Sequence, residues 1–519
     1  MALTETAPPE IEEPTTSEPY GMVRRAQPSG LERVLTTADH QTVGRLYVGF
    51  ALAFLVIDLM VASLVNLQIA SDGGVLDALV AARLDMNHLL GLALCGILPL
   101  ALGLASVIVP KQIGSPTLSF ARAAAWAQWT WLLSAILFGV AIVADGSYGG
   151  DNEAMARLGN VAVGAMLVAL SVGVVCVAVT VLNLRPAGLG LADVPFFSFS
   201  MVVTASVWIM TLPSVLASVV RVHIVGPNTT DLATTGFAGV SWLLIQPAVY
   251  ALLLPVLGII IDSAVVAAGA RLRYRGVFHG LIGVAALLAY GSWAQTDVAR
   301  NTGVWVLFAL AAVLPLLGIL GGLGDMLRQE RPSLISPLGF AVAALLVAVL
   351  AALTGAIAAL DTGGSGSLVG FGAGSMARAQ TYLVIGAAVI GLLGGCVLWA
   401  QQIFGQRLAD GASKGLVLGA ASGAILLGLP HLVLGLVQAS DDGIDPRAFA
   451  GISAVGALLL ALSVLGIAAG GASARRDAGR GDVLVADPWG TGTTLEWTDA
   501  VPNEITSPEP VLDAREAVS

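Results

Sequence analysis

Long apolar stretches dominate the chain and recur along most of its length. Each is about 20 residues long, which is the length an α-helix needs to cross the roughly 30 Å hydrocarbon core of a bilayer. Short polar segments separate the stretches. The pattern predicts an all-α integral membrane protein, a bundle of twelve transmembrane helices at 46–68, 88–109, 123–144, 160–183, 197–220, 236–261, 277–295, 303–323, 337–360, 381–404, 414–437 and 447–470.

Polar sequence at both ends sets the predicted domain boundaries. The membrane domain covers 36–471, between an N-terminal tail over 1–35 and a C-terminal tail over 472–519. The first tail is rich in Pro, Glu and Thr and has no apolar segment typical of a signal peptide, so we expect it to be disordered. We expect the second tail to be irregular.

Composition supports the membrane assignment. Of 519 residues, 56% are hydrophobic and only 11% are charged, whereas a soluble domain has about a quarter of its residues charged. No basic stripe or nucleic-acid motif accompanies the net charge of −10, which argues against nucleic acid as a partner. Cys95, Cys176 and Cys396 all fall in apolar spans and are interpreted as small core residues.

The distribution of Lys and Arg predicts the orientation. Alternate loops on one side hold a single Arg each, and the rest of the 24 basic residues lie on the other side, together with both termini. Basic residues favour the cytoplasmic side of membrane proteins. The sequence therefore predicts a multi-pass protein of the cell membrane with both termini in the cytoplasm.

Glycines recur at helix-packing spacing in two of the predicted spans. Gly415, Gly419 and Gly423 lie four residues apart, as do Gly391 and Gly395. Such rows allow helix backbones to approach closely in lipid. We interpret them as packing positions rather than as a binding site.

Several segments resemble subunit I of the heme-copper respiratory oxidases, the cytochrome c oxidase family. TTADHQTVGRLY (36–47) resembles the segment leading into the family's first helix, IVPKQIGSPTLSFAR (108–122) the loop after its second, and DPWGTGTTLEWT (487–498) its C-terminal tail. QPAVYALLLPVLGII, from Gln246, and AFAGISAVGALLLALS, from Ala448, resemble a metal-site helix and the last helix. The matches follow in order and imply the family's twelve-helix fold.

The resemblance also implies a set of metal ligands. The family reduces oxygen to water at a high-spin heme beside a copper ion, with electrons from a low-spin heme, and six histidines hold these metals. Only His88 falls on a ligand position here, the first of the low-spin pair. The chain has five histidines: His40, His88, His223, His279 and His431. Because five imidazoles cannot fill six positions and only one of them falls on a ligand position, we expect no heme or copper, or at most one heme at His88.

The remaining ligand positions carry other residue types. Gln246, Gln295 and Thr296 stand at the copper positions. Ala387 stands at the high-spin heme position and Val389 at the second low-spin position. Imidazole suits both iron and copper, and none of these side chains replaces it.

Other parts of the family's machinery are replaced as well. The glutamate of one proton path aligns with Ala248, its acidic entrance with Thr117, and the lysine of the second path with Ile319. An arginine pair that binds the heme propionates aligns with Asp441 and Asp442, which reverses the charge. The resemblance therefore implies the family's scaffold without its proton paths.

Four polar residues inside the predicted spans form a candidate polar cavity. Gln246, Tyr250 and Gln295 would face one another in the family's packing, either to bind a ligand or water or to satisfy each other's hydrogen bonds. Asp58 lies mid-span, where an ionised carboxylate costs about 2.5–3.5 kcal/mol. We expect Asp58 to face the bundle interior, as a proton or cation relay or as a neutral acid bonded to a nearby helix.

Three functions remain open at this point. The leading hypothesis is a catalytically degenerate subunit I-like protein, a scaffold or partner of other membrane or respiratory-complex subunits without oxygen reduction. The first alternative is a single-heme electron-transfer or sensing protein that uses His88; the plainer interpretation of that residue is a buried histidine bonded within its own helix. The second alternative is a small-molecule, proton or cation transporter that uses the polar cavity.

Overall fold

The computed structural model describes residues 30–225, 237, 239–244, 248–295, 302–360, 374–438, 444–478, 485–498 and 507–517. Helix α1 (Gly30–Leu35) belongs to an N-terminal unit over 1–37, and every other element belongs to a second unit over 38–519. The N-terminal tail that was predicted to be disordered covers residues 1–35: residues 1–29 lie outside the described residues, and residues 30–35 form α1.

Ten helical stretches of the described residues are long and apolar enough to cross a membrane. The first five are α2 (His40–Ala70), α3 (Ala78–Gly91) with η1 (Leu92–Ile97) and α4 (Leu98–Gln112), α5 (Ala121–Val143), α6 (Glu153–Asn183) and α7 (Phe196–Val225). The others are α11 (Thr302–Ala311) with α12 (Val313–Glu330), α13 (Ser336–Leu360), α14 (Ser375–Leu398), α16 (Asp410–Gln438) and α17 (Arg447–Asp477).

Two shorter apolar helices lie where the sixth and seventh spans were predicted. These are α9 (Leu254–Ala268) and α10 (Arg275–Ala289). Short 3-10 turns, η2 (Trp242–Leu244) and η3 (Ala248–Leu252), precede α9, and η4 (Tyr290–Gln295) follows α10. Pro255 stands in the first turn of α9, where the missing N–H of proline costs no helical hydrogen bond. A helical membrane bundle is confirmed, and the count of twelve spans stays a prediction.

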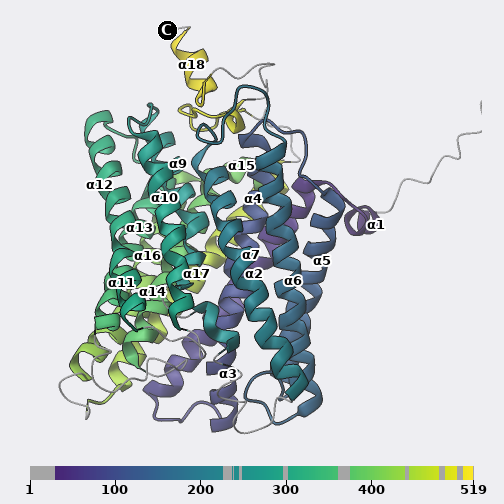
Figure 1. Ribbon diagram of the computed structural model, residues 1–519, viewed down its shortest axis with the longest axis vertical. Coiled ribbons are helices and arrows are strands. Elements are labelled where there is room, and N and C mark those ends of the chain that lie inside the picture. Colours follow the sequence, from purple (N-terminus) through teal and green to yellow (C-terminus); the bar gives the residue numbers. More distant parts are fainter. Residues whose placement is uncertain are drawn as a thin grey trace, which may run out of the picture. The chain divides into compact units, whose positions relative to one another are not determined.

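The helices of the larger unit stand side by side (Figure 1). Helix α14 packs against α13, α16 and α9, and α17 packs against both α16 and α2. The span 78–112 and helix α14 are buried throughout their most apolar windows. These two enclosed spans carry His88, Ala387 and Val389.

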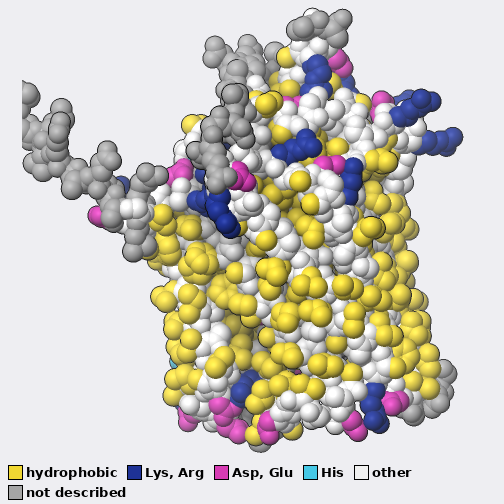
Figure 2. All heavy atoms as spheres, turned by 180° about the vertical axis from the view of Figure 1, so that it is seen from behind, with side chains coloured by type: hydrophobic (Ala, Val, Ile, Leu, Met, Phe, Trp, Pro, Cys, Tyr) yellow, Lys and Arg dark blue, Asp and Glu magenta, His cyan; other side chains and the backbone are white. Residues whose placement is uncertain are grey.

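Hydrophobic side chains form a belt across the middle of the face seen in Figure 2, and charged side chains gather at the two ends of the molecule on that face. Lys and Arg side chains are more frequent at the end where helix α18 (Pro510–Glu516) lies. Such a belt is the surface that a bilayer requires, because lipid chains solvate apolar side chains and not charged ones. The protein is therefore a multi-pass membrane protein.

Close backbone contact joins α2 to α4. A Cβ atom at Gly44 would lie 2.7 Å from the carbonyl oxygen of Gly103, and one at Gly103 would lie 2.9 Å from the carbonyl oxygen of Gly44. Neither distance leaves room for a side chain. In the glycine rows expected from the sequence, Gly423 meets the backbone of Leu460 on α17 in the same way, whereas Gly415 meets nothing within 4 Å.

The C-terminal region is more ordered than the sequence predicts. Helix α17 continues to Asp477, beyond the predicted domain end, and α18 and the 3-10 turn η7 (Leu495–Trp497) follow. The Asp487 carboxylate accepts the backbone N–H groups of Trp489, Gly490 and Gly492 at 3.1, 3.0 and 2.7 Å. Trp489 Nε1 donates to the carbonyl of Leu398 at the end of α14, at 3.0 Å. Local polar bonds therefore fix this segment against the helix ends.

Candidate functional site

His88 lies buried in the last turn of α3, and backbone bonds fix its ring. Its Nδ1 lies 2.9 Å from the carbonyl oxygen of Asp85 and 3.1 Å from that of Leu84. Because carbonyl oxygens only accept, Nδ1 carries the proton and Nε2 is left as the acceptor. Nε2 lies 3.0 Å from the hydroxyl of Tyr382 on α14, which donates to it.

The helix of His88 runs on through a wide π turn, η1, into α4. The indole N–H of Trp131 donates to the carbonyl of Leu94 within this turn at 2.9 Å. A partner from another helix thus supports a backbone geometry that is rare and often occurs at functional sites. The turn lies directly after the candidate ligand position.

The hydrogen bond between His88 and Tyr382 is part of a longer buried chain. Asn66 on α2 donates through Nδ2 to the Tyr382 hydroxyl at 3.1 Å. His431 Nε2, on α16, lies 2.9 Å from Asn66 Oδ1 and donates to it, because an amide oxygen only accepts. The hydrogen bonds of this chain all point the same way: His431 donates to Asn66, Asn66 donates to Tyr382, and Tyr382 donates to His88. Four helices meet in this chain, and all four side chains are buried.

An ion pair lies beside this chain. Arg378, one helical turn before Tyr382, contacts Asp85 with Nη2 at 3.1 Å from Oδ2. The Arg378 side chain is 16% exposed and that of Asp85 is 37% exposed. The pair therefore stands between the buried chain and the surface, and it ties α14 to α3 at the same level as His88.

The hydrogen bonds of His88 match those of a heme ligand at one ring nitrogen only. A ligating histidine donates one ring N–H to a carbonyl and gives the other nitrogen to the metal. His88 meets the first condition, but its Nε2 is engaged by the Tyr382 hydroxyl 3.0 Å away. An iron at Nε2 requires Tyr382 and its bond to Asn66 to move. The residues that the structure describes around His88 therefore do not fit a heme.

The cavity beside Tyr250 is small and apolar. Tyr250 lies in η3, and its hydroxyl accepts a hydrogen bond from Gln380 Nε2 of α14 at 3.3 Å. The cavity beside it has a volume of about 20 Å³, enough for about one water molecule. Its walls are the side chains of Leu253, Leu254, Leu257, Ala285, Ala312 and Leu316.

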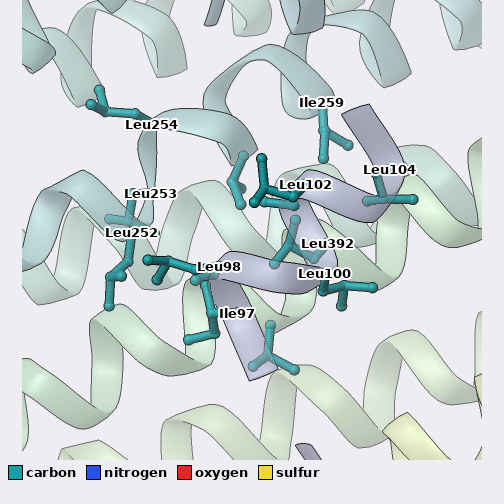
Figure 3. Close-up of a cluster of buried hydrophobic side chains, with 14 of the residues drawn as sticks. Ile97, Leu98, Leu100, Leu102, Leu104, Leu252, Leu253, Leu254, Ile259 and Leu392 are labelled. Carbon is teal, nitrogen blue, oxygen red and sulfur yellow. The ribbon is translucent and has the colours of Figure 1, made fainter. Parts of the chain in front are cut away.

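Leucine side chains fill the space between α4, α9 and α14. Figure 3 shows Leu98 of α4 beside Leu252 and Leu253, with Leu392 of α14 close to Leu100. All of these side chains are buried. Ala387 and Val389 of α14 are also fully buried.

The structure describes two of the four residues assigned to the predicted polar cavity. Gln246 and the side chain of Gln295 lie outside the described residues. Asp58 is half-buried, its Oδ2 atom has no hydrogen-bond partner, and its carboxylate lies so near Gly91 of α3 that a Cβ there would be 2.5 Å from Oδ1. Tyr250 contacts Gln380 instead. A cavity shared by all four residues stays a prediction.

Sequence reasoning missed the residues that surround His88. Asn66 and Tyr382 are polar residues inside apolar spans, the same signal that singled out Asp58 and Tyr250. Their spacing gives no hint that they meet, because 316 residues separate them. His431 is also buried and bonded to Asn66, a contact that its position in the sequence does not indicate.

The bundle of apolar helices, with a chain of buried polar residues that includes His88 of the span 78–112, defines a multi-pass helical membrane protein. Sequence comparison gives its family. The family described as Cytochrome C and Quinol oxidase polypeptide I matches residues 42–467. The chain belongs to this family, whose members normally bind heme and copper. The resemblance found in the sequence motifs is thereby confirmed.

Relatives span most of the chain at low identity. The chain is 24% identical to heme-copper oxidase subunit I+III of Aeropyrum pernix over 78% of its own length and 52% of that protein, so it spans about half of that relative. It is 25% identical to a probable cytochrome c oxidase subunit 1-beta of Nocardia farcinica, over 94% of this chain and 87% of that one. Quinol oxidase subunit 1 of Bacillus subtilis is 22% identical, over 90% and 77%.

Proposed function

We propose that this chain is a catalytically degenerate oxidase subunit I, a scaffold or partner subunit that does not itself reduce oxygen. The observation that carries the proposal is the hydrogen bond between His88 Nε2 and the Tyr382 hydroxyl at 3.0 Å. His88 is the one histidine at a ligand position of the family, and its free electron pair serves a protein hydrogen bond. The other ligand positions have no imidazole.

The packing of the core supports the same proposal. Ala387 and Val389 stand where two heme ligands are expected, and both are fully buried. The cavity beside Tyr250 has room for about one water molecule, whereas a porphyrin is many times larger. Leucine side chains that fill this space pack the helices against each other without a cofactor, and van der Waals packing is what drives helix association in lipid.

The ordered C-terminal segment at one end of the bundle supports a role in assembly. The DPWGTG segment is fixed by the Asp487 carboxylate, and the Arg407 guanidinium lies 4.6 Å from the ring centre of Trp489. This segment carries the most specific sequence resemblance to the family. Retention of an ordered surface above a core without metal ligands favours binding to other oxidase subunits, with both termini in the cytoplasm as the Lys and Arg distribution indicates.

Heme and metal analysis of the full-length protein in detergent tests the proposal. We expect no heme band in the reduced-minus-oxidised spectrum and iron and copper far below one per chain. Stoichiometric heme with copper would contradict it. Under mild detergent, we expect other respiratory-complex subunits to co-purify, and recovery of the chain only as a monomer would contradict the scaffold role.

A matched pair of variants distinguishes the scaffold proposal from the single-heme alternative. If His88 binds one heme, His88→Ala removes the band and His223→Ala, at the end of α7, retains it. We expect neither variant to change the spectrum, because the wild type has no band to lose. A band that depends on His88 alone would replace the scaffold proposal with an electron-transfer or sensing function.

Transport is a second candidate, and Asp58 is the observation that favours it. Its Oδ2 atom is shielded from solvent and has no hydrogen-bond partner, which is unusual for a carboxylate in a membrane span. Proteoliposomes with a pH-sensitive dye measure proton flux. Loss of flux in Asp58→Asn, but not in the exposed control Asp445→Asn, would support transport; equal dye signals with and without protein would exclude proton flux.

A further inference from the structure

A large polar pocket lies where the C-terminal segment meets the ends of α2, α4 and α15 (Ala400–Phe404), away from the site described above. Its volume is about 580 Å³, within the range of about 300–1,000 Å³ that is typical of small-molecule sites. Its walls are formed by Gln41, Arg45, Lys111, Gly114, Ser115, Pro116, Gln401, Gln402, Gly405, Ala486, Leu495, Glu496 and Thr498.

Two cationic residues, Arg45 and Lys111, line this pocket. Arg45 binds neutral oxygens: its Nη2 donates to the backbone carbonyl of Gln402 at 2.9 Å and, more weakly, to Gln41 Oε1 at 3.4 Å. The Nε atom of Arg45 is buried and has no hydrogen-bond partner. Lys111 adds a second positive charge to the same pocket. A cation satisfied only by neutral acceptors retains its attraction for an anion.

The same pocket also contains a buried acceptor without a donor. Gln402 is 6% exposed, and its Oε1 atom has no hydrogen-bond partner, while its Nε2 lies 3.4 Å from the Glu496 backbone carbonyl. The Glu496 carboxylate is engaged through Oε1 by Gln112 at 3.0 Å. Buried acceptors without partners are rare in native proteins and call for a bound molecule or water. The pocket therefore offers cations for an anionic group and a buried oxygen for an N–H or O–H donor.

We propose that this pocket binds a phosphate-bearing molecule that also carries hydroxyl or amine donors. Arg45 and Lys111 would contact the phosphate, for which guanidinium and ammonium groups are well suited, and Gln402 Oε1 would accept from the hydroxyl or amine. Two sources share this chemistry, a soluble phosphate ester and a phospholipid head group. The proposal is independent of whether the chain binds heme.

The test uses full-length protein purified in detergent, with two probes. Calorimetric titration with glycerol 3-phosphate, against chloride at equal ionic strength, measures a soluble source. Native mass spectrometry after addition of phosphatidylglycerol or phosphatidylcholine measures a lipid source; the choline head group has a phosphate but no N–H or O–H donor. We expect glycerol 3-phosphate to bind, or phosphatidylglycerol to be retained in preference to phosphatidylcholine.

Variants make the test specific to the pocket. Arg45→Gln and Lys111→Gln should each weaken binding of the productive probe by tenfold or more, and Arg122→Gln, an exposed cation outside the pocket, should leave it unchanged. Lys111→Gln serves if Arg45→Gln impairs folding, because the Arg45 guanidinium also supports α15. Failure of both probes to bind, or equal binding by Lys111→Gln and Arg122→Gln, would overturn the proposal.

Discussion

The Tyr382 hydroxyl donates to His88 Nε2 across 3.0 Å, and 294 residues of chain separate the two. The bond joins α14 to α3, the two most enclosed spans of the bundle. It gives His88 a protein partner on both ring nitrogens. The same bond sets the direction of the chain of hydrogen bonds that begins at His431.

Tyr382→Phe should destabilise the bundle. The substitution keeps the ring but leaves His88 Nε2 without its donor and removes one of the two acceptors of Asn66 Nδ2, the other being the Ala62 carbonyl. Leaving buried polar groups unsatisfied costs about 1–3 kcal/mol. Chemical denaturation in detergent measures the change. Tyr290→Phe is the control, because its hydroxyl bonds to Ser206 at an exposed site, and equal effects of the two variants would contradict the buried chain.

Gly44→Ala should separate α2 from α4. The new Cβ would lie 2.7 Å from the Gly103 carbonyl oxygen, whereas a Cβ at Gly49 on the same helix meets nothing within 4 Å. Overpacking typically costs about 1–3 kcal/mol, while Gly→Ala in an open helical position gains up to about 1 kcal/mol. Thermal melting of both variants should therefore shift in opposite directions. A stabilised Gly44→Ala variant would show that the close contact is absent.

Docking of the C-terminal segment should weaken as pH rises. Burial, and then the neighbouring Asp262 carboxylate, raises the pKa of Glu496 from 4.5 to about 7. Between these values the undocked form is ionised and the docked form keeps its proton, so docking is stronger at acid pH. This contribution is lost between pH 4.5 and 7, and it amounts to roughly 3 kcal/mol at most.

Hydrogen exchange of residues 487–498, corrected for intrinsic rates, measures this docking. Protection should fall between about pH 4.5 and 7 in the wild type and change less in Glu496→Gln. Glu330→Gln, an exposed carboxylate at the end of α12, should keep the wild-type dependence. Equal pH profiles of the wild type and Glu496→Gln would contradict the assignment.

Arg275→Gln should destabilise the docked tail more than Arg271→Gln. The Arg275 side chain is 14% exposed; it donates to the carbonyls of Asp193 and Val194 and lies 3.5 Å from the buried carboxylate of Glu509. Removing one partner of a buried ion pair costs about 3–5 kcal/mol. Arg271 contacts Asp513 and Glu516 at the surface, where such pairs contribute about 0–1 kcal/mol.

Limited proteolysis of the tail and thermal melting compare the two variants. Arg271 also lies 3.8 Å from Glu509. Arg271→Gln therefore measures the stability of the docked tail when Glu509 loses its exposed partner and keeps its buried partner, Arg275. We expect rapid cleavage near α18 in Arg275→Gln and near wild-type resistance in Arg271→Gln. The reverse order would show that the surface network, and not the buried pair, anchors the tail.

The sequence predicted most of the fold because hydropathy is a local property. A run of apolar residues must be helical in lipid, where every backbone N–H and C=O needs a partner within its own segment. Ten spans follow from this requirement, and ordered motifs such as 487–498 indicated the family. Between residues 236 and 261, by contrast, the described residues form 3-10 turns before α9, because hydropathy does not report backbone geometry.

The polar contacts required the tertiary structure. The sequence by itself determined a helical membrane protein of the oxidase subunit I family with five histidines and one of them at a ligand position. Only the packing of α2, α3, α14 and α16 decided that His88 meets Tyr382 and that Asn66 meets His431. Which side chains meet depends on how each helix is rotated and how closely its small residues let it approach a neighbour, and neither quantity is encoded in a single span.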